Sequence, residues 1–339
     1  MSQTLQAQSN FTQEDLPSNA VIPVSPQGFK WERKHVIDSS QLSMAEVHEV
    51  LNTARSFAGI LKRPVKKVPT LRGKVVVNLF YENSTRTRAS FELAAKYLSA
   101  ELMNFSIDTS SVKKGESLID TAETLLAMGV DAMVIRHGSS GVCQQLAKHF
   151  GNRLGLLNAG DGQHDHPTQG LLDLFSMTAR VPDLKGKKIV IVGDVMHSRV
   201  ARSNIHFLNL FGADVHVVGP STLLPHSVEM LGCSAHTDIE SALADADIVM
   251  CLRMQLERQR SGTIPALSEY TRLYGITSER LTRFCKADVL VMHPGPMNRG
   301  VEIASDVADH PEISLITNQV TNGVAIRMAL LYLILSTPS

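Results

Sequence analysis

The chain has 339 residues, of which 43% are hydrophobic and 19% charged, which is an ordinary composition for a globular protein of about two domains. Lysine plus arginine equals aspartate plus glutamate, at 33 each, so no overall field favours nucleic acid or an anionic membrane, and any bound anion needs a local cluster of donors. Four scattered cysteines without metal-ligand spacing and an N-terminus without a signal-peptide pattern predict a cytoplasmic protein with no metal site.

The first half of the chain alternates strand and helix patterns. Residues 1–30 are rich in Gln, Ser, Asn and Pro and predict a flexible N-terminal tail. Apolar residues at helical spacing follow over 44–61, and after them come short apolar runs that predict strands. In chain order we expect strands at 74–80, 101–106, 132–135 and 154–158, with helices at 88–100, 116–128 and 167–177.

A turn-rich break at 181–187 precedes a second alternating set. Here we expect strands at 188–192, 214–218, 247–252 and 287–292 and helices at 199–210 and 324–335. The apolar run 325–335 contains Arg327 and is too short to span a bilayer, so we interpret it as a buried helix that packs on the first half.

Alternating strands and helices of these lengths are typical of an α/β fold with parallel sheets. We therefore predict two domains, each a parallel sheet flanked by helices in a doubly wound arrangement. The first domain covers 31–180 and is completed by the C-terminal helix (320–339), and the second domain covers 181–319.

The strongest chemical signal is the sequence Ser-Thr-Arg-Thr-Arg at 84–88, which lies between a predicted strand and a predicted helix. A helix N-terminus offers unpaired backbone N–H groups and the positive end of the helix dipole. A lone Ser84 there would be an ordinary helix cap, with the arginines in solvent. The whole cluster of hydroxyls and guanidiniums at one turn instead favours a phosphate site.

Two further polar groups fall at strand ends of the same half. Arg136 ends the strand 132–135, and ligands of parallel sheets bind beyond the carboxyl ends of their strands. His166 and Gln169 open the helix at 167–177, where His166 can polarise a carbonyl group and Gln169 can recognise an NH2 group. His164 and His166 also form a His-x-His pair, but no third metal ligand has suitable spacing.

In the second half, Arg199 and Arg253 follow predicted strands, and two arginines suit a substrate with two carboxylates. Gly193-Asp194 ends a strand but lacks the glycines of a dinucleotide fingerprint, which disfavours a nicotinamide dehydrogenase. The segment His293-Pro294-Gly295-Pro296 predicts a rigid loop, with a cis bond before Pro296 as one option and an ordinary tight turn as the other.

Together, Ser-Thr-Arg-Thr-Arg at 84–88, the sequence RHGSSG at 136–141 and His-Pro-Thr-Gln at 166–169 resemble the carbamoyl phosphate motifs of the aspartate/ornithine carbamoyltransferase family. The resemblance runs from about residue 34 to residue 335. It implies that a carbamoyl group is transferred from carbamoyl phosphate to an amine, with no cofactor and no metal. It also implies a homotrimer whose active sites are shared between subunits, and it leaves open whether regulatory or pathway-enzyme subunits join.

Two motifs bear on the choice of amine. His-Pro-Thr-Gln and His-Pro-Gly-Pro are similar to the aspartate branch of the family, although Gly295 replaces its common Leu. The resemblance thus implies carbamoylation of L-aspartate, an early step of de novo pyrimidine biosynthesis. The alternatives are a related amine such as ornithine, or a catalytically silent anion-binding subunit.

The resemblance also implies a role for each site residue. Catalytic roles fall on Arg86, Thr87, Arg136 and His166. Carbamoyl phosphate would bind to Ser84, Thr85, Arg86, Thr87, Arg136, His166, Gln169, Gly295 and Pro296. Aspartate would bind to Lys114, Arg199, Arg253 and Gln255. Lys114 matches a family loop that enters the neighbouring subunit's site together with a serine, either Ser110 or Ser111.

Overall fold

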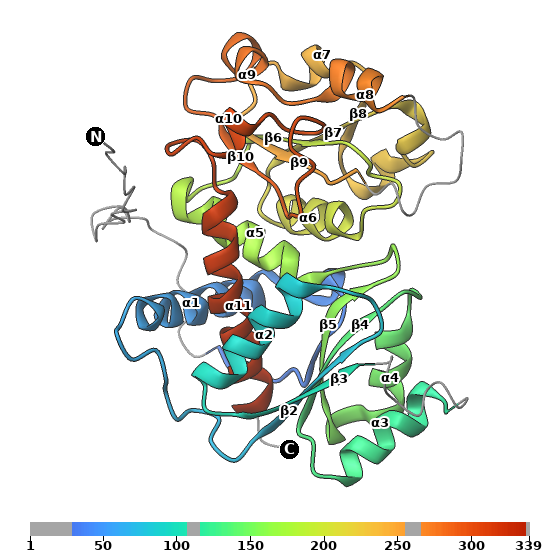
Figure 1. Ribbon diagram of the computed structural model, residues 1–339, viewed down its shortest axis with the longest axis vertical. Helices are drawn as coiled ribbons and strands as arrows, with labels where there is room; N and C mark the ends of the chain where they lie inside the picture. Colours follow the sequence, from blue (N-terminus) through green and yellow to red (C-terminus); the bar gives the residue numbers. More distant parts are fainter. Residues whose placement is uncertain (1–28, 107–115, 255–265, 337–339) are drawn as a thin grey trace, which may run out of the picture.

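The computed structural model describes residues 29–106, 116–254 and 266–336, so the predicted tail lies almost wholly outside the described residues. Two parallel sheets form its two halves, as predicted, and each has five strands, one more than the sequence indicated (Figure 1). The first sheet has the spatial order β1 (His35–Val36), β5 (Gly155–Asp161), β4 (Ala132–His137), β2 (Val75–Phe80) and β3 (Glu101–Ser106). The second has the order β10 (Leu290–Met292), β9 (Ile248–Cys251), β6 (Lys188–Val192), β7 (Asp214–Val218) and β8 (Ser234–His236).

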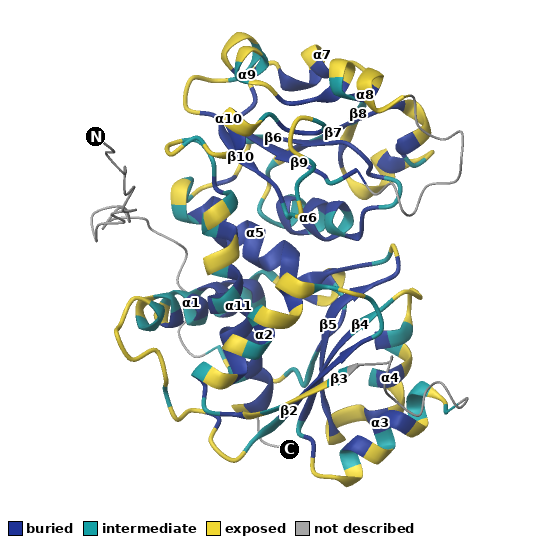
Figure 2. Cartoon of the chain, viewed as in Figure 1, coloured by how far each residue is buried: buried dark blue, intermediate teal, exposed yellow. Residues whose placement is uncertain are grey.

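Helices cover both faces of each sheet, which leaves the central strands buried, whereas the edge strands β3 and β8 are partly exposed (Figure 2). On the first sheet, one face carries α3 (Leu118–Ala127) and α4 (Val142–Phe150), and the other carries α1 (Met44–Leu61), α2 (Thr85–Tyr97) and α5 (Pro167–Arg180). On the second, α6 (Arg199–Leu210) lies on the side of the first half, and the far side carries α7 (Ile239–Leu243), α8 (Leu267–Tyr274), α9 (Ser278–Phe284) and α10 (Ser305–Ala308).

Each strand contributes to both covered faces, because its successive side chains point to opposite sides of the sheet. In β2, Val76 packs into the cluster formed with α1, α2 and α5, whereas Val77 packs into the cluster formed with α3 and α4. Strands covered on both faces favour apolar residues at most positions, and the buried polar exceptions, such as Asn78 and Asn158, are hydrogen-bonded. This is why such strands appear in the sequence as apolar runs.

The last helix, α11 (Ile316–Ser336), starts at the second sheet and runs down across the first half, where it packs against α1, α2 and α5 (Figure 1, red). By length and composition alone α11 could cross a membrane, but 67% of its most apolar window is buried inside the molecule. Its apolar character is therefore explained by packing. The helix begins eight residues before the predicted start at 324, because its first two turns are polar and carry no apolar period.

Several elements differ from the sequence prediction. Helix α2 begins at Thr85 rather than at Arg88, so most of the phosphate-site motif forms its first turn. Helices α4 and α7–α10 and the edge strands β1 and β8 were not predicted. These helices have four to nine residues and these strands two or three, which is too short to show a clear period.

Candidate active site

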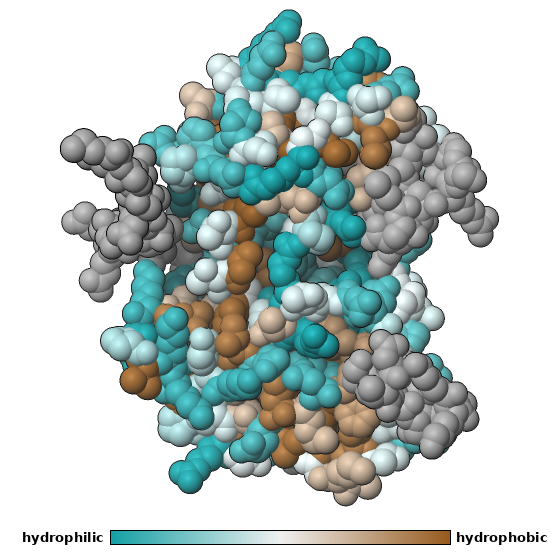
Figure 3. Space-filling model, in the orientation of Figure 1, coloured by the Kyte–Doolittle hydropathy of each residue, from teal (hydrophilic) through white to brown (hydrophobic). Residues whose placement is uncertain are grey.

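A cavity of about 850 Å³ lies between the two halves, where the molecular surface is hollowed (Figure 3). It opens beyond the carboxyl ends of β2, β4, β9 and β10, as expected for parallel sheets. All predicted site residues within the described part of the chain line it: Ser84, Thr85, Arg86, Thr87, Arg136, His166, Gln169, Arg199, Arg253, Gly295 and Pro296. The remaining candidates, Lys114, Gln255, Ser110 and Ser111, lie outside the described residues.

The N-terminus of α2 forms one wall. Ser84 is the N-cap residue in an extended conformation (φ −158°), yet its side chain accepts no hydrogen bond from the first turn. Its hydroxyl therefore does not serve the capping role that would have explained the residue without a ligand. Thr85, Arg86 and Thr87 follow in the first turn and border the cavity, whereas Arg88 is exposed and does not. One guanidinium of the motif reaches the cavity, not two.

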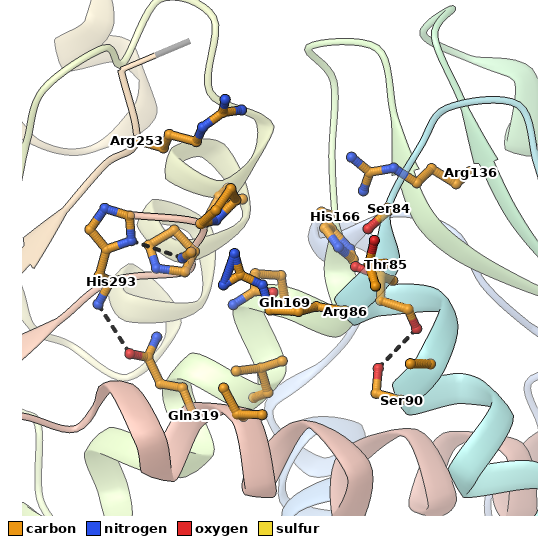
Figure 4. Close-up of a pocket in the computed structure, with 18 of the residues that line it drawn as sticks. Ser84, Thr85, Arg86, Ser90, Arg136, His166, Gln169, Arg253, His293 and Gln319 are labelled. Carbon is orange, nitrogen blue, oxygen red and sulfur yellow. Dashed lines mark hydrogen bonds between the residues drawn. The ribbon is translucent and has the colours of Figure 1, made fainter. Parts of the chain in front are cut away.

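Arg86 and Arg253 approach the cavity from opposite halves of the molecule (Figure 4). Partial burial, and after it the positive charge of Arg253, lowers the pKa of Arg86. Two guanidiniums that repel one another across a cavity both gain when an anion lies between them. The electrostatics of this cavity therefore favour anionic ligands, in a chain whose net charge is zero.

Glu82 links the arginines and was missed in the sequence analysis. Its Oε2 accepts a hydrogen bond from Nη2 of Arg199 at 2.6 Å and lies 3.4 Å from Nε of Arg136. Arg199 also donates from Nη1 to the carbonyl oxygen of Gly162 at 3.2 Å. Arg199, on the second half, is thus held by two groups of the first. The only available sequence signal was a carboxylate two residues before Ser84.

The two histidines of the His-x-His pair have separate environments. His166 is buried at the cavity wall; burial first, and then the charges of Arg136, Arg199 and Arg327, keeps its pKa well below the ordinary value. It is therefore neutral and can donate one N–H to a ligand. Hydrogen bonds to Asp161 and Asp38 raise the pKa of His164 to about 10, so that ring is positively charged. Among the residues that the structure describes, no group of three or more His, Cys, Asp or Glu side chains could hold a metal ion.

The loop 293–296 closes the cavity from the second half, and its peptide bond before Pro296 is cis. The backbone N–H of Gly295 donates to Nδ1 of His293 at 2.8 Å, and Nε2 of the same ring lies 3.1 Å from Glu302. Pro294 and Pro296 have no N–H. Each backbone N–H of the loop is therefore either already hydrogen-bonded, as at His293 and Gly295, or absent, as at the two prolines. The loop backbone offers only carbonyl acceptors to a ligand.

Gly295 also makes room for Arg86. It has a left-handed backbone (φ +65°), and a β-carbon at this position would lie 1.9 Å from Nη1 of Arg86. The guanidinium of Arg86 therefore occupies the space that any side chain at position 295 would need. This contact gives a physical reason for glycine at position 295, where the sequence departs from the leucine common in the aspartate branch of the family.

The fold and the site together define a two-domain α/β protein with a cavity between its domains that is suited to anionic ligands. Residues 34–179 match the family model "Aspartate/ornithine carbamoyltransferase, carbamoyl-P binding domain", and residues 185–334 match the "Asp/Orn binding domain" of the same family. The chain belongs to the aspartate/ornithine carbamoyltransferase family.

Individual relatives agree with this assignment. The aspartate carbamoyltransferase catalytic subunit of Thermosynechococcus vestitus is 53% identical over 323 residues, covering 92% of this chain and 97% of the relative. The corresponding subunit of Acaryochloris marina is 55% identical over 314 residues, covering 90% and 97%. Among solved structures, aspartate transcarbamoylase of Trypanosoma cruzi in complex with carbamoyl phosphate and aspartate superposes with a TM-score of 0.78 at 26% identity, covering 92% and 98%. The catalytic subunit of M. Jannaschii aspartate transcarbamoylase superposes with a TM-score of 0.76 at 34% identity, covering 90% of this chain and 98% of that structure.

Proposed function

We propose that this protein transfers the carbamoyl group of carbamoyl phosphate to the amino group of L-aspartate, which yields N-carbamoyl-L-aspartate and phosphate. This reaction would be an early step of pyrimidine biosynthesis. The observation that carries the proposal is that one cavity brings together groups from both halves. The N-terminus of α2, from the first half, faces Arg253 and the loop 293–296 of the second half, whose backbone offers only acceptors. Each of these groups matches one part of the two substrates.

Carbamoyl phosphate fits the first half and the loop. Its phosphate would bind to the α2 N-terminus, with Ser84, Thr85, Arg86 and Thr87 as donors. Its carbonyl oxygen would accept hydrogen bonds from Thr87, Arg136 and the neutral His166. Its NH2 group needs acceptors, which the loop carbonyls at Gly295-Pro296 and the side-chain oxygen of Gln169 would supply.

Aspartate would bind through its two carboxylates on the side of the second half. Arg253 and Arg199 border the cavity there, and Lys114 and Gln255 complete the set implied by the family resemblance. Arg199 carries five donors, so its bonds to Glu82 and Gly162 are compatible with a further carboxylate. The amine of aspartate would then lie against the carbamoyl carbon.

The transfer itself would proceed by attack of the neutral amine on the carbonyl carbon. Holding both substrates in one cavity removes most of the entropic cost of their encounter. The developing oxyanion is stabilised by donors that are already in place at Thr87, Arg136 and His166. The phosphate leaves and takes the proton of the amine, because no side chain of the described cavity stands out as a general base.

The direct test is incubation of the purified chain with carbamoyl phosphate plus either L-aspartate or L-ornithine, with both phosphate and carbamoylated amine measured. We expect product with aspartate only. Product with ornithine alone would move the chain to a different branch of the family. Absence of product with either amine, despite tight phosphate binding, would leave only an anion-binding role.

We further propose a cytoplasmic homotrimer in which Lys114 completes the site of the adjacent subunit. Mixed trimers of Arg86→Ala chains and Lys114→Ala chains should then regain part of the activity, because some sites would receive an intact residue from each chain. Each mutant alone should be nearly inactive. If verified mixed trimers regain no activity, sites are not shared through these two residues.

A further inference from the structure

A buried carboxylate lies directly behind the cavity, at the junction of three helices. Asp173 of α5 is fully buried, and its two oxygens accept three side-chain hydrogen bonds. Oδ1 accepts from Nε2 of Gln169 at 2.9 Å and from Nε2 of Gln319, on α11, at 2.7 Å. Oδ2 accepts from Nδ2 of Asn204, on α6, at 2.9 Å. We call these four residues the Asp173 hub.

The hub determines which end of the Gln169 amide faces the ligand. Burial raises the pKa of Asp173 to about 6, so the carboxylate is ionised at neutral pH and can only accept hydrogen bonds. The NH2 end of Gln169 must therefore face Asp173, since a reversed amide would set oxygen against oxygen. The other end of this amide, at the cavity wall, is then its carbonyl oxygen, which is an acceptor.

Asp173 also fixes the orientation of the Gln319 amide, which contacts the loop 293–296. Nε2 of Gln319 donates to Asp173, so Oε1 of Gln319 points the other way and accepts the backbone N–H of His293 at 3.1 Å (Figure 4). His293 in turn receives the N–H of Gly295. Through Gln319, one carboxylate thus anchors the loop whose carbonyls face the cavity. Both sets of acceptors, on opposite walls, depend on the same buried group.

We propose that Asp173 is a positioning residue for substrate selection: by orienting Gln169 and Gln319, it presents only acceptors to the NH2 group of the carbamoyl donor. This inference rests on the proposed function. It predicts that loss of Asp173 impairs recognition of the NH2 group and spares recognition of the phosphate, which is bound by the α2 N-terminus without the hub. A merely structural role would weaken every ligand alike.

The test compares three ligands on the full-length protein by calorimetry: inorganic phosphate, phosphonoacetamide (a stable phosphonate with a primary amide) and acetonylphosphonate (the matching methyl ketone). The variants are Asp173→Leu, which keeps the shape but offers no acceptor, and Asp173→Asn, which keeps the volume but leaves three donors with one acceptor. The matched control is Asp247→Asn, because Asp247 is a buried carboxylate bound by Lys187, Lys286 and the Lys188 backbone, far from the cavity.

In the wild type and in the control, we expect the amide to bind more tightly than the ketone. In the Asp173 variants, the Kd of the amide should rise by about tenfold, the effect of one lost hydrogen bond, while the Kd values of ketone and phosphate change less than twofold. Wild-type selectivity in either folded variant, or an equal loss for all three ligands, overturns the role of Asp173. No amide preference in the wild type would instead contradict the proposed recognition of the carbamoyl group.

Discussion

Replacing Gly295 with alanine should displace Arg86 from the phosphate site. The new β-carbon would lie 1.9 Å from Nη1 and 2.7 Å from Cζ of Arg86, whereas ordinary contacts begin at 3.4 Å. The guanidinium would have to retreat by about 1.5 Å, which is enough to break a hydrogen bond to a phosphate oxygen. A lost charge-assisted hydrogen bond costs about 2 kcal/mol, or roughly a thirtyfold loss of kcat/KM for carbamoyl phosphate.

The substitution also strains the backbone, so a matched control is needed. Gly300 has the same left-handed conformation (φ +79°), but a β-carbon there would meet nothing within 4 Å. Both alanine variants should lose about 1 kcal/mol of folding stability. Only Gly295→Ala should lose activity and phosphate affinity, as measured by initial rates at saturating aspartate and by phosphate calorimetry. Equal activity of the two variants would refute the argument that Arg86 needs the space at position 295.

Three further predictions concern single side chains. Arg136→Ala should lower kcat by about 10²- to 10³-fold, since it removes a donor to the oxyanion; a near-normal kcat in a folded variant would exclude that role. Arg253→Ala should raise the KM for aspartate by roughly tenfold or more and change carbamoyl phosphate binding little, and an unchanged aspartate response would remove Arg253 from the proposed clamp. Burial raises the pKa of Asp173 from its ordinary value of 3.8 to about 6 in the folded protein. The folded state therefore holds this proton more tightly than the unfolded state, and the free energy of unfolding falls by up to about 3 kcal/mol as the pH rises from 4 through 6. Urea unfolding between pH 4 and pH 8 should therefore show stability shifting in favour of Asp173→Asn with rising pH, and a pH-independent difference would contradict the buried ionisation.

The sequence alone led to the α/β class and to the residues of the cavity wall. Buried parallel strands appear in the sequence as apolar runs, so β6 was predicted at its observed bounds, as were β7 and the edge strand β3, which are partly exposed. The motif at 84–88 indicated an anion site because its chemistry is local: hydroxyls, guanidiniums and a helix N-terminus lie within five residues. Arg136 could be assigned to the same sheet edge as the 84–88 motif, and Arg199 and Arg253 to the ligand edge of the second half, because the carboxyl ends of parallel strands in one sheet share an edge.

Only the tertiary structure revealed the groups that act through other residues. Glu82 accepts a hydrogen bond from Arg199, which is 117 positions away in the sequence, and Asp173 accepts one from Gln319, which is 146 positions away. Neither contact can be inferred from the neighbouring sequence. In the sequence, Asp173 of α5 and Gln319 of α11 look like ordinary helix residues, because no local pattern indicates a hydrogen-bond partner on another helix. The space beside Gly295 was equally invisible, because it depends on where the Arg86 side chain ends. A sequence lists donors and acceptors, whereas their orientation depends on packing between segments that are distant along the chain.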